Sequence, residues 1–172
     1  MNRHLYHYTI AGILFTAIAG TLLHFAYEYS MENPLVAMFA PVNESTWEHM
    51  KLIFFPMLLY SVFAIPRLKG NYPCITSAFL SGTLVGTFLI PVIFYTYTGI
   101  LGYHLFILDI LTFVLSVMAA FYLVFQLSVS CSMNRFLPFL YFLVYFMILS
   151  FAVFSFFPPN IGLFADPASP VK

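Results

Sequence analysis

Residues 43–51, with the sequence NESTWEHMK, gather four ionisable side chains in a chain of which only 7% is charged. Carboxylates and imidazoles in one place can hold a divalent metal ion such as zinc, or transfer a proton. The same letters also predict a helix start, because Ser45 followed three residues later by Glu48 fits a capping box. Capping could account for Glu48 alone, but it gives His49 no role.

A second imidazole and carboxylate lie four residues apart in LHFAYE, at His24 and Glu28. This spacing places both side chains on one stripe of a helix, where they can bind a metal or pass a proton. The alternative is a hydrogen bond at a helix end, with Glu28 in water.

Asp109 stands in the apolar segment LFILDIL, with no polar neighbour in sequence. A carboxylate inside a membrane is costly unless it is paired, protonated or bound to a metal, so we expect Asp109 to face other helices. The alternative is a neutral, buried, hydrogen-bonding acid. His104 is five residues away, which is not the same face of a helix, so the two meet only if His104 precedes the helix.

The composition excludes a water-soluble domain, since 62% of the 172 residues are hydrophobic. Net charge is zero and no basic run occurs, so we expect no nucleic-acid partner. Apolar runs long enough to cross about 30 Å of hydrocarbon predict an all-α fold, a polytopic bundle of five transmembrane helices in one domain. The predicted spans are residues 9–27, 47–66, 75–98, 102–127 and 136–157. The first run could instead be a signal peptide.

The basic residues predict the orientation, because cytoplasmic loops carry the excess of Lys and Arg. Four of the six basic residues lie before the first span, after the second or after the fourth, which are all on the same side of the membrane. This pattern places the N-terminus in the cytoplasm and the C-terminus outside. Lys51 and Lys172 fall on the outer side. The four that agree are Arg3, Arg67, Lys69 and Arg135.

This orientation sorts the other polar residues onto the outer half of the bilayer, with only His4, His7 and Gln126 on the inner half. The outer residues are His24, Glu28, Glu32, Glu44, Glu48, His49, His104 and Asp109. Cys74 and Cys131 fall in cytoplasmic loops, where thiols stay reduced, so we expect neither a disulfide nor a metal pair.

Two further features concern packing and the connection before the second span. Small residues in the third span, Gly82 and Gly86, and in the first span, Gly12, Thr16 and Gly20, would let helices approach closely, within the bundle or between two copies of the chain. Pro34 and Pro41 make the first outer connection irregular and able to fold over the site. We expect Trp47 to be an interfacial anchor.

Two roles are possible for Lys51. Its long side chain can lift the ammonium group to the lipid headgroups, or the ammonium group can neutralise a nearby carboxylate.

The NESTWEH block, the apolar spans and the Pro-Pro pair followed by FADP near the end resemble a family of small, uncharacterised bacterial multi-spanning membrane proteins. The resemblance covers nearly the whole chain. It implies a multi-pass protein of the bacterial inner membrane, and it implies no particular activity or ligand set.

Three hypotheses follow. The first is a metal site in the outer half of the membrane that hydrolyses or transfers a group on a lipid-like ester or amide, with Glu44 or Glu48 as general base. The second is proton- or cation-coupled transport. The third is a non-catalytic membrane partner whose charges only cap helices and pair with one another. The candidate metal ligands are His24, Glu28, Glu48, His49, His104 and Asp109, with Glu44 in reserve.

Overall fold

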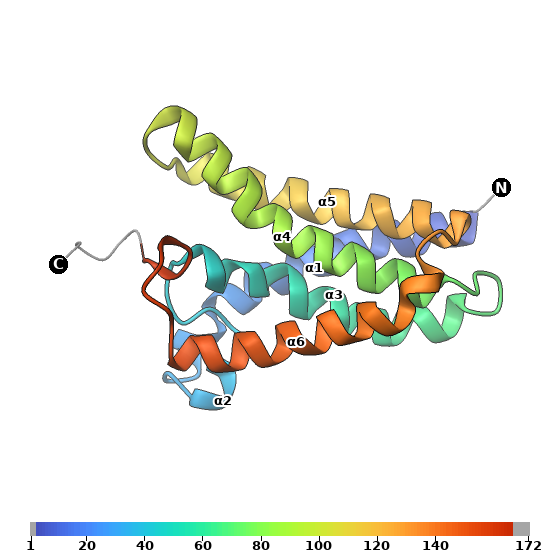
Figure 1. The fold of residues 1–172 in the computed structure, drawn as a ribbon, viewed down its shortest axis with the longest axis horizontal. Coiled ribbons are helices and arrows are strands. Elements are labelled where there is room, and N and C mark those ends of the chain that lie inside the picture. Colours follow the sequence, from blue (N-terminus) through green and yellow to red (C-terminus); the bar gives the residue numbers. More distant parts are fainter. Residues whose placement is uncertain (1–2, 167–172) are drawn as a thin grey trace.

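The computed structural model describes residues 3–166 and is all-α, with five long helices (Figure 1). All five are long and apolar enough to cross a membrane, which supports the predicted multi-pass architecture. Pro167 and Lys172, used in the predictions above, lie outside the described residues. The long helices are α1 (Arg3–Tyr29), α3 (Thr46–Leu68), α4 (Ile75–Leu101), α5 (Phe106–Ser130) and α6 (Leu137–Phe156). The short elements are α2 (Pro34–Ala37), η1 (Asn134–Phe136) and η2 (Gly162–Phe164).

The helices follow the predicted spans, and they differ mainly at their ends. Helix α4 continues to Leu101, beyond the predicted end at residue 98. Gly102 then stops it, because its φ of +80° is a left-handed conformation that glycine adopts without strain. Residues 102–105 therefore form the link to α5, which starts at Phe106 rather than residue 102.

The helices pack as an antiparallel α4–α5 hairpin, with α1 against α3 and α5, and with α6 against α4 and α3 (Figure 1). Small residues allow the closest approaches. A Cβ atom on Gly12 would lie 2.7 Å from the Tyr60 ring, and one on Gly20 would lie 2.5 Å from the backbone oxygen of Leu52. The predicted small-residue faces are therefore used inside the bundle.

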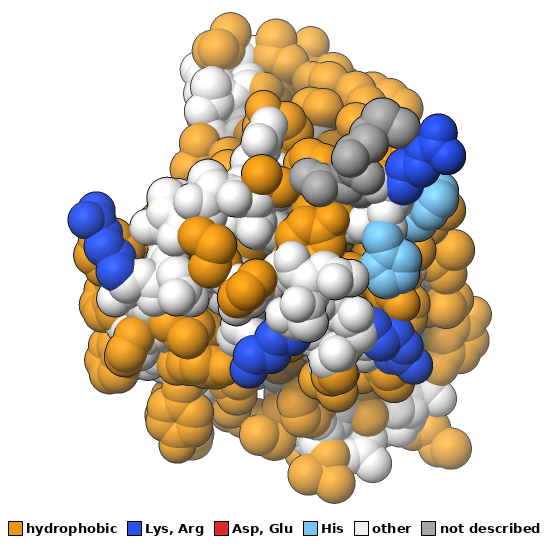
Figure 2. Space-filling view, turned by 90° about the vertical axis from the view of Figure 1, so that its right-hand side faces the viewer, with side chains coloured by type: hydrophobic (Ala, Val, Ile, Leu, Met, Phe, Trp, Pro, Cys, Tyr) orange, Lys and Arg blue, Asp and Glu red, His pale blue; other side chains and the backbone are white. Residues whose placement is uncertain are grey.

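The two ends of the bundle differ in charge. Arg3, Arg67, Lys69 and Arg135 lie near the start of α1, the end of α3 and the start of α6. Figure 2 looks onto this end and shows basic side chains and histidines but no acidic side chain. The described carboxylates of helices α1, α3 and α5 lie toward the other end, so the predicted separation of charge is present in the fold.

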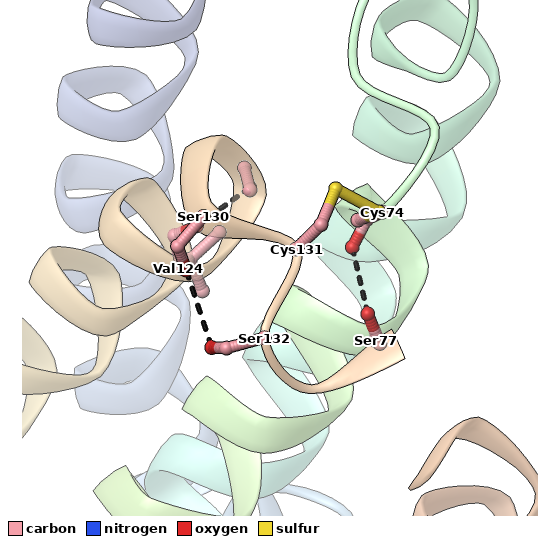
Figure 3. Close-up of a disulfide and its surroundings, with 7 residues drawn as sticks. Cys74, Ser77, Val124, Ser130, Cys131 and Ser132 are labelled. Carbon is pink, nitrogen blue, oxygen red and sulfur yellow. Dashed lines mark hydrogen bonds between the residues drawn. A yellow bond between two sulfur atoms is a disulfide. The ribbon is translucent and has the colours of Figure 1, made fainter. Parts of the chain in front are cut away.

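The expectation of two reduced cysteines is wrong in this structure, where Cys74 and Cys131 form a disulfide (Figure 3). Cys74 precedes α4 and Cys131 follows α5. The antiparallel hairpin brings these ends together although 57 residues separate them in sequence. Sequence spacing could not reveal this contact, because it depends on which helices are neighbours.

The hairpin gives a sharp test of helix packing. A Cβ atom at Gly82 would lie 2.7 Å from the backbone oxygen of Ala120, which cannot move aside as a side-chain end could. We expect Gly82→Ala to destabilise the protein by about 1–3 kcal/mol, measured by thermal unfolding in detergent. Gly99→Ala is the matched control, since nothing lies within 4 Å of its Cβ position. Equal stability of the two variants would contradict the tight α4–α5 contact.

Candidate functional site

Three segments meet at the acidic end of the bundle: the last turns of α1, the α2–α3 connection and the first turn of α3. Helices α1 and α3 are antiparallel and touch where Gly20 meets the backbone of Leu52. One turn closer to the acidic end, four residues after Gly20 on α1 and three residues before Leu52 on α3, His24 and His49 face each other with ring centroids 5.3 Å apart. The register of the two helices therefore places both imidazoles side by side.

His49 is oriented by a backbone carbonyl. Its Nδ1 atom lies 2.9 Å from the Ser45 oxygen, and a carbonyl can only accept, so Nδ1 carries the hydrogen. The Nε2 atom lies 3.4 Å from a carboxylate oxygen of Glu44, and it presents a lone pair there when His49 is neutral. Metal-bound histidines are typically held in this way, with the second nitrogen donating to a carbonyl or carboxylate.

Glu44 lies between the two imidazoles. Its other carboxylate oxygen is 3.8 Å from His24 Nε2, so each oxygen faces one ring. A lone pair of neutral His49 facing a carboxylate is repulsive unless a proton or a cation lies between them. His24 Nδ1 is buried and has no hydrogen-bond partner within residues 3–166.

The three side chains fit a metal ion. Their ligand atoms lie within 4.8 Å of one another. A tetrahedral zinc ion with bonds of about 2.0–2.1 Å separates its ligands by roughly 3.3 Å, so small side-chain movements would close the site. The side chain of Glu44 is 54% exposed, and the site is open to the surroundings on that side. A fourth coordination position would therefore remain for water or substrate.

Of the residues predicted from sequence, the structure brings His24, His49 and Glu44 together. Glu28 is exposed on α1 and is not among the three, although it lies four residues from His24. Glu48 points elsewhere and is buried, with 2% of its surface exposed. Asp109 and His104 form a separate pair on the α4–α5 hairpin.

Glu48 belongs to a buried network centred on Lys51, which is completely buried. The Lys51 ammonium lies 2.6 Å from Glu48 Oε2 and 2.5 Å from Ser155 Oγ on α6. It also donates to the backbone oxygens of Ala37, at 2.8 Å, and Ala40, at 3.2 Å. Of the two roles expected for Lys51, neutralising a carboxylate is the one observed. Ser155 could not be predicted as a partner of Lys51, because nothing in its local sequence indicates this contact.

The predicted capping box is only half formed. Ser45 accepts from the backbone N–H of Glu48, at 3.4 Å, and so caps α3. The backbone N–H of Val42 donates instead to the Glu48 carboxylate. The backbone N–H of Ser45 donates to the side-chain oxygen of Asn43. Glu48 therefore anchors the connection to α3 and is not simply a cap.

Trp47 is not the expected interfacial anchor. It is 6% exposed, and its ring packs against Phe151, at 4.8 Å, and Phe164, at 4.9 Å. Trp47 thus fastens α6 and the segment after it to the start of α3.

Asp109 has the partners that its apolar surroundings require. The Tyr97 hydroxyl donates to one carboxylate oxygen, and His104 Nδ1 lies 3.3 Å from the other. His104 reaches it because it precedes α5, as the five-residue spacing demanded. Figure 1 shows this hairpin tip standing apart from the joined ends of α1 and α3.

The fold and the site define a multi-pass membrane protein with a His/Glu cluster that could hold a metal ion. The chain belongs to a family of unknown function, DUF6512, whose model matches residues 1–170. No curated protein and no solved structure matches the chain.

The buried ion pair can be tested by breaking one partner and then both. Lys51→Met should destabilise the protein by about 3–5 kcal/mol, because Glu48 and two carbonyls would stay buried without their partner. Adding Glu48→Gln should recover part of this loss, since the buried charge is removed. Unfolding in detergent measures both, with exposed Lys69→Met as control. A Lys51→Met protein as stable as Lys69→Met would contradict the network.

Proposed function

We propose that this protein binds a divalent metal ion, zinc or a similar first-row ion, through His24, Glu44 and His49 in the membrane. The observation that carries the proposal is the orientation of His49. Its Nδ1–H is fixed on the Ser45 carbonyl, and its Nε2 atom is directed at the Glu44 carboxylate, 3.4 Å away. Two nitrogens and a carboxylate suit zinc and its neighbours.

The chemistry proposed for the site is hydrolysis or group transfer on a lipid-like substrate. A bound metal ion with an open position supplies Lewis acidity or an activated water. The two carboxylates named as general bases differ in availability. Glu44 is exposed beside both imidazoles, whereas Glu48 is buried against Lys51 and cannot reach a substrate. Of the two, only Glu44 can therefore take part in the site, and we assign it the role of metal ligand rather than general base.

Transport is the alternative with some support of its own. Five hydroxyls on α1, α4 and α5 are buried without a hydrogen-bond partner within residues 3–166, and they could contact water inside the bundle. They are Thr16, Ser81, Thr83, Thr87 and Ser116. The proposal of a non-catalytic partner subunit accounts for Glu48 and Lys51 but gives the two imidazoles no purpose.

We further propose that the basic end lies in the cytoplasm and that the metal site lies toward the outside. The distribution of Arg and Lys supports this orientation. The disulfide at the same end favours the opposite orientation, because disulfides are rare in the cytoplasm. We give the basic residues more weight, since they act during membrane insertion and four of them agree.

The metal site is tested by plasma mass spectrometry on detergent-purified protein. The wild type is expected to carry near-stoichiometric metal, and His49→Ala and His24→Ala should each lower its content at least about tenfold. His104→Ala and Asp109→Asn are matched controls, because these residues lie outside the cluster, and both should keep the metal.

A folded wild-type protein that contains no metal and takes up none from added zinc would overturn the proposal. The same variants would then be assayed for proton flux in liposomes. Loss of metal in His104→Ala and Asp109→Asn, with metal kept in His49→Ala, would instead move the site to the hairpin tip.

Orientation is tested with one introduced cysteine. Asn71→Cys in a Cys74→Ser, Cys131→Ser background places a thiol in the loop after α3, at the basic end. A membrane-impermeant maleimide should label it in broken cells and leave it unlabelled in intact cells. Labelling in intact cells would place the basic end and the disulfide outside, and the metal site in the cytoplasmic half.

A further inference from the structure

An apolar groove of about 430 Å³ lies between α1 and α3, on the outer surface of the bundle. Helix α1 contributes Ala19 and Leu23, and α3 contributes Phe55, Leu59 and Val62. Phe39, from the segment between α2 and α3, also lines it. We propose that this groove binds one acyl chain of a membrane glycerophospholipid, with the oxygens of its headgroup or ester at the His24–Glu44–His49 site.

The groove begins beside the metal site. Leu23 directly precedes His24 on α1. On α3, Phe55 is six residues beyond His49 and Val62 is thirteen, which at 1.5 Å per residue is about 9 Å and about 20 Å along the helix. Half of a hydrocarbon layer is about 15 Å thick. The groove therefore extends from the level of the site through one leaflet, as an acyl chain does.

The surroundings favour a lipid chain over other occupants. Both helices are membrane spans, and Leu59 and Val62 are more than half exposed, so the groove opens sideways to lipid. A peptide or a polar ligand would leave hydrogen-bonding groups unpaired at this depth. A hydrocarbon chain has none.

Phe39 links the groove to the buried network. Lys51 binds the backbone oxygens of Ala37 and Ala40, on either side of Phe39. The Phe39 ring in turn packs edge-on against Phe55, with centroids 5.1 Å apart. The same ammonium group therefore fixes the wall of the groove and, through Glu48, the start of the helix that carries His49.

The position of the headgroup rests on the proposed function, whereas occupation of the groove does not. A metal ion at His24, Glu44 and His49 would have an open position for an oxygen ligand. Phosphate and ester oxygens lie where the acyl chains of a phospholipid begin. Glycerophospholipids are therefore the substrate class of the proposed site.

The test uses phosphatidylglycerol with a photoreactive diazirine in one acyl chain, added to the reconstituted protein. Crosslinked peptides are mapped by mass spectrometry. Labelling should concentrate on the groove residues of α1 and α3, relative to lipid-facing Leu115 and Met118 on α5. Ala19→Phe fills the groove and should lower this labelling about tenfold. Ile18→Phe, at a neighbouring exposed position, is the matched control and should leave it unchanged.

Equal labelling of the groove and α5, or unchanged labelling in Ala19→Phe, would overturn the groove assignment. The metal content of Ala19→Phe, expected to equal that of the wild type, reports on the proposed function separately. His49→Ala should weaken phospholipid labelling about tenfold while a diazirine hydrocarbon without a headgroup labels as before. Unchanged phospholipid labelling in His49→Ala would overturn the headgroup position alone.

Discussion

The start of α3 and the segments packed on it depend on the ammonium group of Lys51, the one fully buried cation within residues 3–166. An unpaired charge at this position would be strongly destabilising, so every oxygen around it is constrained in place. These oxygens come from Glu48 on α3, from the backbone at the end of α2 and just after it, and from Ser155 on α6. One charge therefore fixes three separate parts of the chain. Lys51 and the Val42–Glu48 hydrogen bond hold the connection before Glu44, and the Ser45 cap holds it after Glu44.

This network and the His/Glu cluster share one helix turn but have opposite character. Glu48 and Lys51 neutralise each other in an environment closed to water, where further chemistry would be difficult. Glu44, just before α3, is exposed, and His49, in the first turn, is partly exposed, with its Nε2 atom facing the Glu44 carboxylate. The sequence NESTWEHMK thus has two roles. Its buried residues Glu48 and Lys51 hold the helix and the connection in place, whereas Glu44 and His49 belong to the His/Glu cluster.

The α4–α5 hairpin is fastened independently at both of its ends. At the acidic end the Asp109 carboxylate joins Tyr97 of α4 to α5 and to His104. At the basic end the Cys74–Cys131 disulfide joins the same two helices. Between them, small residues bring the backbones into contact. The partners Tyr97 and His104 explain how Asp109 is accommodated in a membrane without belonging to the His24–Glu44–His49 cluster.

The sequence by itself determined the features that depend on neighbouring residues. The length and hydropathy of the apolar runs predict five spans, and the positions of Arg and Lys predict a basic end. Ser45 predicts the start of α3. Each of these features is a local property of the sequence. Only the tertiary structure decided the partners: Lys51 with Ser155, His24 with Glu44, and Cys74 with Cys131. These contacts depend on the order and rotation of the helices in the bundle. Apolar side chains nearly all around each helix leave little trace of either in the sequence, so the helix faces that meet could not be predicted.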